Sequence, residues 1–131
     1  MAEPTSAPAY RTISVSPVTP AIGAVVEGLD LRKPLDEVQR REVHEALLRH
    51  LVLFFRGQDL DDAQHIAFAG VFGKPNVFPT TAARGLDEPI EWIEDGPESP
   101  PKTDLWHTDV AFLDEPPDVA VLNMRETPAA G

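Results

Sequence analysis

The sequence predicts an α+β fold in which short β-strands alternate with two helices. Short apolar or alternating runs, separated by proline and glycine, are typical of strands. Two capping-box patterns mark the starts of helices. A chain of 131 residues, 42% hydrophobic and 25% charged, is long enough for one soluble domain with a modest core.

Composition argues against several classes of protein. The net charge of −11 and the lack of a Lys/Arg cluster disfavour nucleic acid and membrane surfaces as partners. The absence of cysteine excludes disulfides, thiolate catalysis and Cys-based metal sites. No apolar run is long enough to span a membrane, and the N-terminus lacks the pattern of a signal peptide. We therefore expect a cytoplasmic protein with a disordered lead-in over residues 1–11.

The first elements are two strands followed by a helix. Residues 13–18 alternate and then meet prolines, which predicts an edge strand, and residues 23–29 predict a second strand paired with it. Asp36 as N-cap with Gln39 three residues later predicts a helix start, and Leu35 is placed as a hydrophobic staple. The apolar stripe of this helix comprises Val43, Ala46, Leu47 and His50.

The middle of the chain repeats this pattern. Residues 51–55 are continuously apolar, which predicts a strand buried on both faces. Asp61 and Gln64 form the second capping box, and the helix that they start is expected to stop at Gly73. His44 and His50 are expected to lie at the surface or rim, and His65 is expected to be a solvated helix residue.

Prolines and glycines break the stretch from residue 74 to 104. Residues 90–94 alternate like a strand, and residues 94–104 form a polar loop that fits either a substrate cover or a plain linker. Residues 119–124 predict another buried strand. No capping element follows that strand, so we expect a truncated domain.

Residues 105–112 predict a strand that carries the candidate metal site. Residues two apart point to the same side of a strand, so His107 and Asp109 should face one way. With one more imidazole they would complete the 2-His-1-carboxylate triad of non-haem Fe(II) oxygenases. The alternative is a strand histidine that is hydrogen-bonded to a neighbouring carboxylate.

Several segments, in order, make the sequence resemble the taurine dioxygenase / 2,4-D dioxygenase (TauD/TfdA) family of Fe(II)- and 2-oxoglutarate-dependent dioxygenases. The resemblance covers nearly all of residues 12–131. Its Trp-His-Thr-Asp core is far more specific than a bare His-x-Asp. The matching segments are residues 22–31 (IGAVVEGLDL), 34–35 (PL), 49–56 (RHLVLFFR), 72–73 (FG), 106–112 (WHTDVAF), 116–117 (PP) and 126–131 (ETPAAG).

The resemblance implies a double-stranded β-helix (jelly-roll, cupin-like) with flanking helices, present here only in part. Residues 12–131 would be the N-terminal part of the dioxygenase domain, and its C-terminal part would be missing. His107 and Asp109 would be the first two iron ligands. The third ligand, a distal His, and the Arg and Thr that hold the 2-oxoglutarate carboxylate would lie beyond residue 131.

The same resemblance implies the reaction and its partners. Fe(II) and 2-oxoglutarate would be used with O₂ to hydroxylate a small organic substrate, releasing succinate and CO₂. The full-length protein is expected to be a homo-oligomer. Thr103 and Phe112 fall where family members line the substrate pocket, although Phe112 could equally be core. Residues 72–79 lack the His of sulfonate-using members, which argues against taurine.

Two alternatives to this enzyme stay open at the level of sequence. One is a non-catalytic β-helix module for binding or assembly. The other is a zinc hydrolase that uses His107, Asp109 and one helix histidine, because zinc needs three protein ligands. As a fragment, the 131-residue chain is expected to be inactive alone and to aggregate or oligomerise through unpaired strands.

Overall fold

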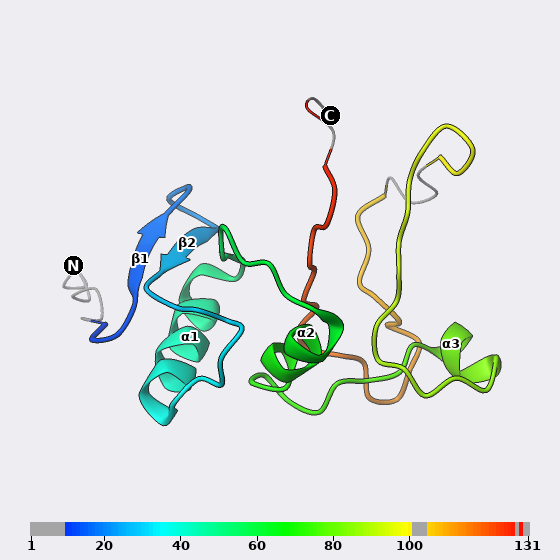
Figure 1. Ribbon diagram of the computed structural model, residues 1–131, viewed down its shortest axis with the longest axis horizontal. Coiled ribbons are helices and arrows are strands. Elements are labelled where there is room, and N and C mark those ends of the chain that lie inside the picture. Colours follow the sequence, from blue (N-terminus) through cyan, green and yellow to red (C-terminus); the bar gives the residue numbers. More distant parts are fainter. Residues whose placement is uncertain (1–9, 101–104, 128, 130–131) are drawn as a thin grey trace, which may run out of the picture. The chain divides into compact units, whose positions relative to one another are not determined.

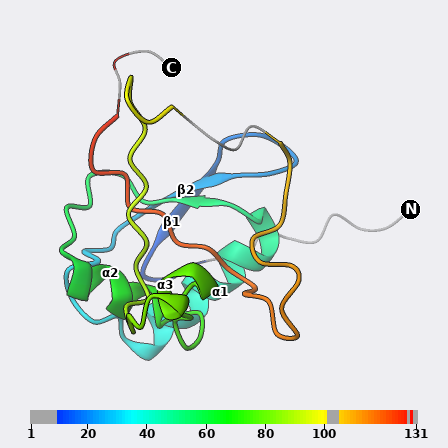
Figure 2. The same ribbon diagram turned by 90° about the vertical axis from the view of Figure 1, so that its right-hand side faces the viewer.

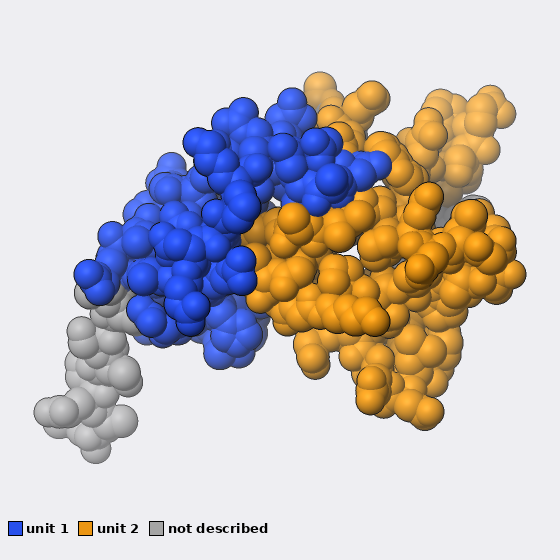
Figure 3. Space-filling model, turned by 60° about the horizontal axis from the view of Figure 1, so that its bottom comes forward, with its two compact units in different colours: residues 1–64 blue, residues 65–131 orange. Residues whose placement is uncertain are grey.

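The computed structural model describes residues 10–100, 105–127 and 129 (Figure 1). The chain divides into two compact units, residues 1–64 and residues 65–131 (Figure 3). No helix in the described ranges is long and apolar enough to cross a membrane.

The first unit contains a small sheet. Strand β1 (Ser14–Pro17) pairs antiparallel with β2 (Ala24–Glu27), and β2 pairs parallel with β3 (Leu53–Phe54), so the order is β1-β2-β3. The first two strands confirm the two predicted near the N-terminus. Gly28 ends β2 with a φ of 96°, a backbone conformation that glycine adopts without strain.

Helix α1 (Glu37–His50) follows β2 and forms for the reasons expected from sequence. The Asp36 carboxylate accepts from the Gln39 amide at 2.9 Å, and the Gln39 side chain accepts from the Asp36 amide at 2.9 Å. The helix ends where Leu51 turns into the left-handed region, with a φ of 65°. Figure 2 shows α1 beside the small sheet, and the apolar core of this unit comprises Ile13, Ala24, Val26, Leu31, Leu35, Val43, Ala46 and Leu60.

The predicted strand over residues 51–55 is wrong in its extent and burial. Only Leu53 and Phe54 are in β3, and Leu51 and Val52 are 63% and 39% exposed. Among the described strands β3 lies at the edge of the sheet and pairs with β2 alone. An apolar run specifies burial only when elements are present on both of its faces.

The second capping box is confirmed. Asp61 and Gln64 exchange backbone-to-side-chain hydrogen bonds of 3.0 and 2.8 Å at the start of α2 (Asp62–Ala69). The helix stops at Ala69 rather than at Gly73, and the turns after it bring the ring of Phe72 edge-on to that of Phe68 at 5.6 Å. A short helix, α3 (Pro79–Ala83), forms in the stretch that prolines and glycines were expected to break. Its proline is at the first position of the helix, where proline is well tolerated.

The three strands predicted after residue 74 are not formed among the described residues of the second unit. No strand ladder forms in the predicted ranges, which are residues 90–94, 105–112 and 119–124. Among the described residues of this unit, the strand-like pairing is one isolated bridge between Gly96 and Ser99. Trp92 and Leu122 are 69% and 77% exposed. Alternation of apolar and polar residues indicates a segment suited to a strand. The strand forms only when a neighbouring strand hydrogen-bonds its backbone N–H and C=O groups. The double-stranded β-helix is not displayed in the described residues and stays a prediction.

Candidate functional site: a His107–Asp109 pair

His107 and Asp109 lie together, as expected, but on a turn rather than on a strand. Their side chains approach at 3.1 Å, from His107 Nε2 to Asp109 Oδ1. The chain bends at Val110, which is 7% exposed and has a φ of 42°. The bend is closed by a hydrogen bond from the Leu113 amide to the Val110 carbonyl at 3.0 Å. The shared side of the pair therefore comes from a buried anchor at Val110, not from the two-residue period of a strand.

The Leu105 carbonyl sets the tautomer of the His107 ring. Its oxygen lies 2.9 Å from His107 Nδ1, and a carbonyl oxygen can only accept, so Nδ1 carries the proton. The lone pair of the neutral ring is then on Nε2, the atom that faces Asp109. A backbone carbonyl leaves no signature in a sequence, so this orienting partner of His107 could not be named from the residues alone.

Electrostatics favour the charged form of His107 when no metal is present. The Leu105 carbonyl that accepts from the ring raises the pKa of His107, burial opposes this, and the Asp109 carboxylate adds to the increase. Both side chains are about half exposed, at 54% and 49%. The pair is thus accessible to a ligand or metal from solvent.

The donor set fits two adjacent positions of a metal centre. Ligand atoms about 2.0–2.2 Å from a metal and at right angles to each other lie about 3 Å apart, close to the 3.1 Å between Nε2 and Oδ1. Imidazole and carboxylate together suit Fe(II) in a facial triad. Within the described ranges no group of three or more His, Cys, Asp or Glu side chains could hold a metal.

The helix histidines do not complete this site among the described residues. His65 is half-buried, and its Nε2 donates to the Val121 carbonyl at 3.0 Å, so the expectation of a solvated His65 is wrong. His44 and His50 lie on α1, in the first unit. The zinc hydrolase hypothesis, which requires one of these as third ligand, therefore has no support in the described part of the chain.

The two candidate substrate contacts have different outcomes. Thr103 lies outside the described residues. Phe112 lies on the turn after Asp109 and is 79% exposed, so the alternative that Phe112 is a core residue is wrong for the described structure. A substrate role for either residue stays a prediction.

Comparison with known proteins gives a consistent family. The family model described as "Taurine catabolism dioxygenase TauD, TfdA family" matches residues 14–131. An alkylsulfatase of Acinetobacter baylyi is 37% identical over 123 residues, covering 92% of this chain and 38% of the relative. An alpha-ketoglutarate-dependent sulfate ester dioxygenase of Pseudomonas putida is 35% identical over 128 residues, covering 96% and 42%. The chain thus spans about two fifths of the length of these relatives.

Solved structures agree over a shorter stretch. A taurine dioxygenase from Burkholderia xenovorans is 42% identical and superposes with a TM-score of 0.50, covering 51% of this chain and 25% of that chain. A putative alpha-ketoglutarate dependent 2,4-D dioxygenase from the same organism is 37% identical with a TM-score of 0.50, covering 54% and 28%. These matches confirm the resemblance seen in the sequence, and the chain belongs to the taurine catabolism dioxygenase TauD, TfdA family.

Proposed function

We propose that residues 12–131 are the N-terminal part of an Fe(II)- and 2-oxoglutarate-dependent dioxygenase that hydroxylates a small organic substrate. The observation that carries the proposal is the His107–Asp109 pair, with His107 Nε2 and Asp109 Oδ1 3.1 Å apart and Nδ1 held by the Leu105 carbonyl. Membership of the family supports the reaction class, because relatives across it are named as alpha-ketoglutarate-dependent dioxygenases.

Each residue of the pair has a distinct role in this proposal. His107 Nε2 donates its lone pair to the metal, while Nδ1–H stays on the Leu105 carbonyl and holds the ring in orientation. The Asp109 carboxylate supplies a second ligand and offsets one positive charge. Bound Fe(II) with 2-oxoglutarate would supply O₂ activation, placing one oxygen atom in succinate and the other in the substrate. The third ligand and the residues that hold 2-oxoglutarate come from outside residues 1–131.

A sulfate ester is the substrate class that we propose to test first. Two relatives that cover more than nine tenths of this chain are named as an alkylsulfatase and a sulfate ester dioxygenase. Hydroxylation of the carbon that bears the ester oxygen gives an unstable hydroxy ester, which collapses to an aldehyde and sulfate. The exposed ring of Phe112 would offer an apolar contact to the alkyl part, and Thr103 would offer a hydroxyl.

The iron proposal is tested without turnover. Fe(II) and 2-oxoglutarate are added anaerobically to the 131-residue chain and to the polypeptide of its complete reading frame, and the charge-transfer absorption of the chelate is recorded. We expect a weak signal from the short chain and a strong one from the longer polypeptide. In the longer polypeptide His107→Ala should abolish the signal, whereas His44→Ala, an exposed histidine of α1, should leave it unchanged. A full signal in the His107→Ala variant would refute the ligand assignment.

The substrate proposal is tested by turnover of the longer polypeptide. Succinate and inorganic sulfate are measured with an alkyl sulfate, with a phenoxyacetate and with taurine as competing candidates. Equal release of succinate and sulfate with the alkyl sulfate supports the proposal. Succinate release with the phenoxyacetate or with taurine instead rejects sulfate esters but keeps the dioxygenase. No succinate with any of them, together with no chelate signal, favours a non-catalytic module.

A further inference from the structure

A cavity of about 630 Å³ lies in the first unit, outside the His107–Asp109 pair. It is bounded by the turn between β1 and β2 and by the C-terminal end of α1. The cavity is open to solvent, because five of its six lining residues are exposed and His50 is half-buried. The lining comprises Pro17, Thr19, Pro20, Ala21, Arg49 and His50. It holds two basic side chains and no carboxylate, although the chain has 22 acidic residues against 11 Lys and Arg.

The two basic side chains are not needed to cap their own helix. Basic residues in a last turn often hydrogen-bond the final carbonyls. Here backbone amides already do so: the Leu51 amide donates to the Leu47 carbonyl at 2.7 Å, and the Gly23 and Val52 amides donate to the His50 carbonyl at 2.9 and 2.8 Å. The Arg49 and His50 side chains have no ion pair or hydrogen bond within the described residues. Their donors are available to a ligand.

The opposite wall is a preformed turn. Thr19 Oγ1 donates to the Ile22 carbonyl at 2.6 Å and accepts from the Ile22 amide at 3.0 Å. The Val18 amide donates to the Gly23 carbonyl at 2.8 Å and closes the same turn. Prolines at 17 and 20 restrict the backbone further. A ligand would therefore meet an ordered apolar surface and would not have to fold it.

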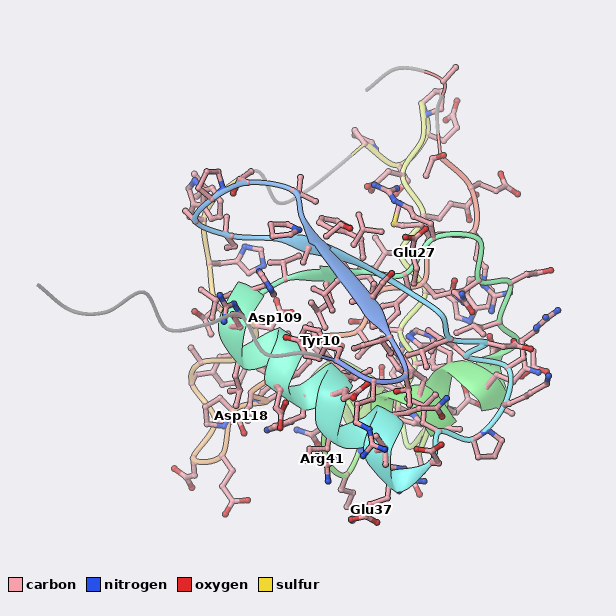
Figure 4. The ribbon with its side chains drawn as sticks, turned by 90° about the vertical axis from the view of Figure 1, so that its left-hand side faces the viewer. Tyr10, Glu27, Glu37, Arg41, Asp109 and Asp118 are labelled. Atoms are coloured by element: carbon pink, nitrogen blue, oxygen red, sulfur yellow. The ribbon has the colours of Figure 1, made fainter. Side chains whose placement is uncertain are left out.

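The Tyr10 hydroxyl lies within electrostatic reach of Arg49, and of Glu45 and Glu42, but Tyr10 does not line the cavity. The hydroxyl of Tyr10 is buried and has no hydrogen-bond partner among the described residues. Burial raises the pKa of Tyr10, and the nearby positive charge of Arg49 opposes that increase. Figure 4 shows Tyr10 beside α1. Tyr10 is therefore not one of the donors that we propose for a ligand.

We propose that this cavity binds a small organic oxyanion. The charged head would lie on the Arg49 guanidinium and the His50 imidazole, which donates a hydrogen bond in either protonation state. The apolar body would lie on Pro17, Pro20 and Ala21. The proposal goes beyond the dioxygenase chemistry, because it uses only residues of the first unit and none of the iron-site residues.

Binding is measured by NMR on the isotope-labelled 131-residue chain, at a concentration at which sedimentation velocity shows a monomer. Butyl sulfate and butanoate are titrated separately, and 1-butanol serves as an uncharged analogue. We expect saturable shifts of the Thr19 and Ala21 amides and of the Arg49 side chain with one or both anions and none with the alcohol. The anion that binds more tightly identifies the head group as sulfate or carboxylate. Equal shifts with 1-butanol, or shifts located elsewhere, would overturn the proposal.

Two variants and a matched control test the residues. Arg49→Gln should raise the Kd about ten-fold or more, because it removes a charge-assisted donor. Arg41→Gln makes the same charge change at an exposed position of α1 that does not line the cavity, and it should leave the Kd unchanged. Ala21→Asp places a carboxylate in the wall and should abolish binding without altering Arg49 or His50. Circular dichroism checks that each variant keeps its helix, and an unchanged Kd in Arg49→Gln contradicts the site.

Discussion

Replacing Glu42 by glutamine should destabilise the first unit, because this buried carboxylate holds the N-terminal segment on α1. Glu42 is 4% exposed. Its Oε1 accepts from the Arg11 amide at 2.6 Å, and its Oε2 accepts from the Thr12 amide at 2.9 Å and from Thr12 Oγ1 at 2.6 Å. The contacts join residues about thirty positions apart in the chain, so they tie the N-terminal segment to α1.

The magnitude follows from the donors that would lose their acceptor. Glutamine keeps one oxygen and turns an NH₂ group toward donors that were satisfied. A buried hydrogen bond to a charged group contributes about 1.5–3 kcal/mol. The Thr12 amide and the Thr12 hydroxyl donate to the same oxygen, so the energies of these two hydrogen bonds are not additive. We therefore expect a loss of about 2–4 kcal/mol in the free energy of unfolding, which is less than the sum over the separate hydrogen bonds. Against a typical total of about 5–15 kcal/mol this loss is large.

The same carboxylate predicts a pH dependence of stability. Burial raises the pKa of Glu42, but the hydrogen bonds from Thr12 and from the Arg11, Thr12 and Ile13 amides outweigh it, so the pKa lies below its usual 4.5. Between the lowered pKa and the usual one, the folded state binds fewer protons than the unfolded state. The free energy of unfolding therefore falls as the pH drops below about 4.5 and through the lowered pKa.

The assay is urea unfolding followed by the far-ultraviolet circular dichroism of the helices, at neutral pH and at several lower pH values. Glu42→Gln should lower the free energy of unfolding at neutral pH. At low pH the variant should lose less stability than the unmodified chain, because it lacks the Glu42 carboxylate that becomes protonated. Glu45→Gln is the control, because Glu45 is on the same helix and half exposed, with Arg41 at 4.0 Å. If Glu42→Gln lowers the free energy of unfolding no more than Glu45→Gln does, the Glu42 carboxylate does not hold the N-terminal segment on α1 as we infer.

Three further predictions concern the fold. Asp36→Ala should cost about 1 kcal/mol by removing the N-cap of α1, and Asp36→Asn less, as measured by urea unfolding; equal losses would exclude the cap as the cause. Gly28→Ala should cost about 1–2 kcal/mol, because its Cβ would lie 3.0 Å from the Thr12 carbonyl oxygen at a φ of 96°. Gly57→Ala, with no atom within 4 Å of the added Cβ, controls for the positive φ alone. The 131-residue chain should self-associate with rising concentration in sedimentation velocity, because apolar side chains such as Trp106 and Leu122 are 105% and 77% exposed; a monomer that unfolds cooperatively at all concentrations would contradict this.

Local signals predicted much of the first unit correctly. The capping boxes at Asp36 and Asp61 place both helix starts, because cap and backbone lie within four residues of each other. The two strands before α1 were also predicted, since a hairpin pairs neighbours in the chain. The sequence also predicted that His107 and Asp109 lie together, but the reason is the bend at Val110 and not the two-residue period of a strand.

Tertiary structure decided what depends on distant partners. The strands predicted after residue 74 do not form ladders among the described residues. An alternating pattern predicts which side chains share a face, but it cannot supply the neighbouring strand that would satisfy the backbone amides. The second-unit bend at Val110, the Leu105 carbonyl on His107 and the His65 contact to Val121 are likewise absent from any local pattern. The sequence by itself determined the family, and it named the two side chains that we propose as metal ligands. Only the folded chain decided the ring tautomer and the backbone that orients it, because these depend on where a carbonyl lies in space.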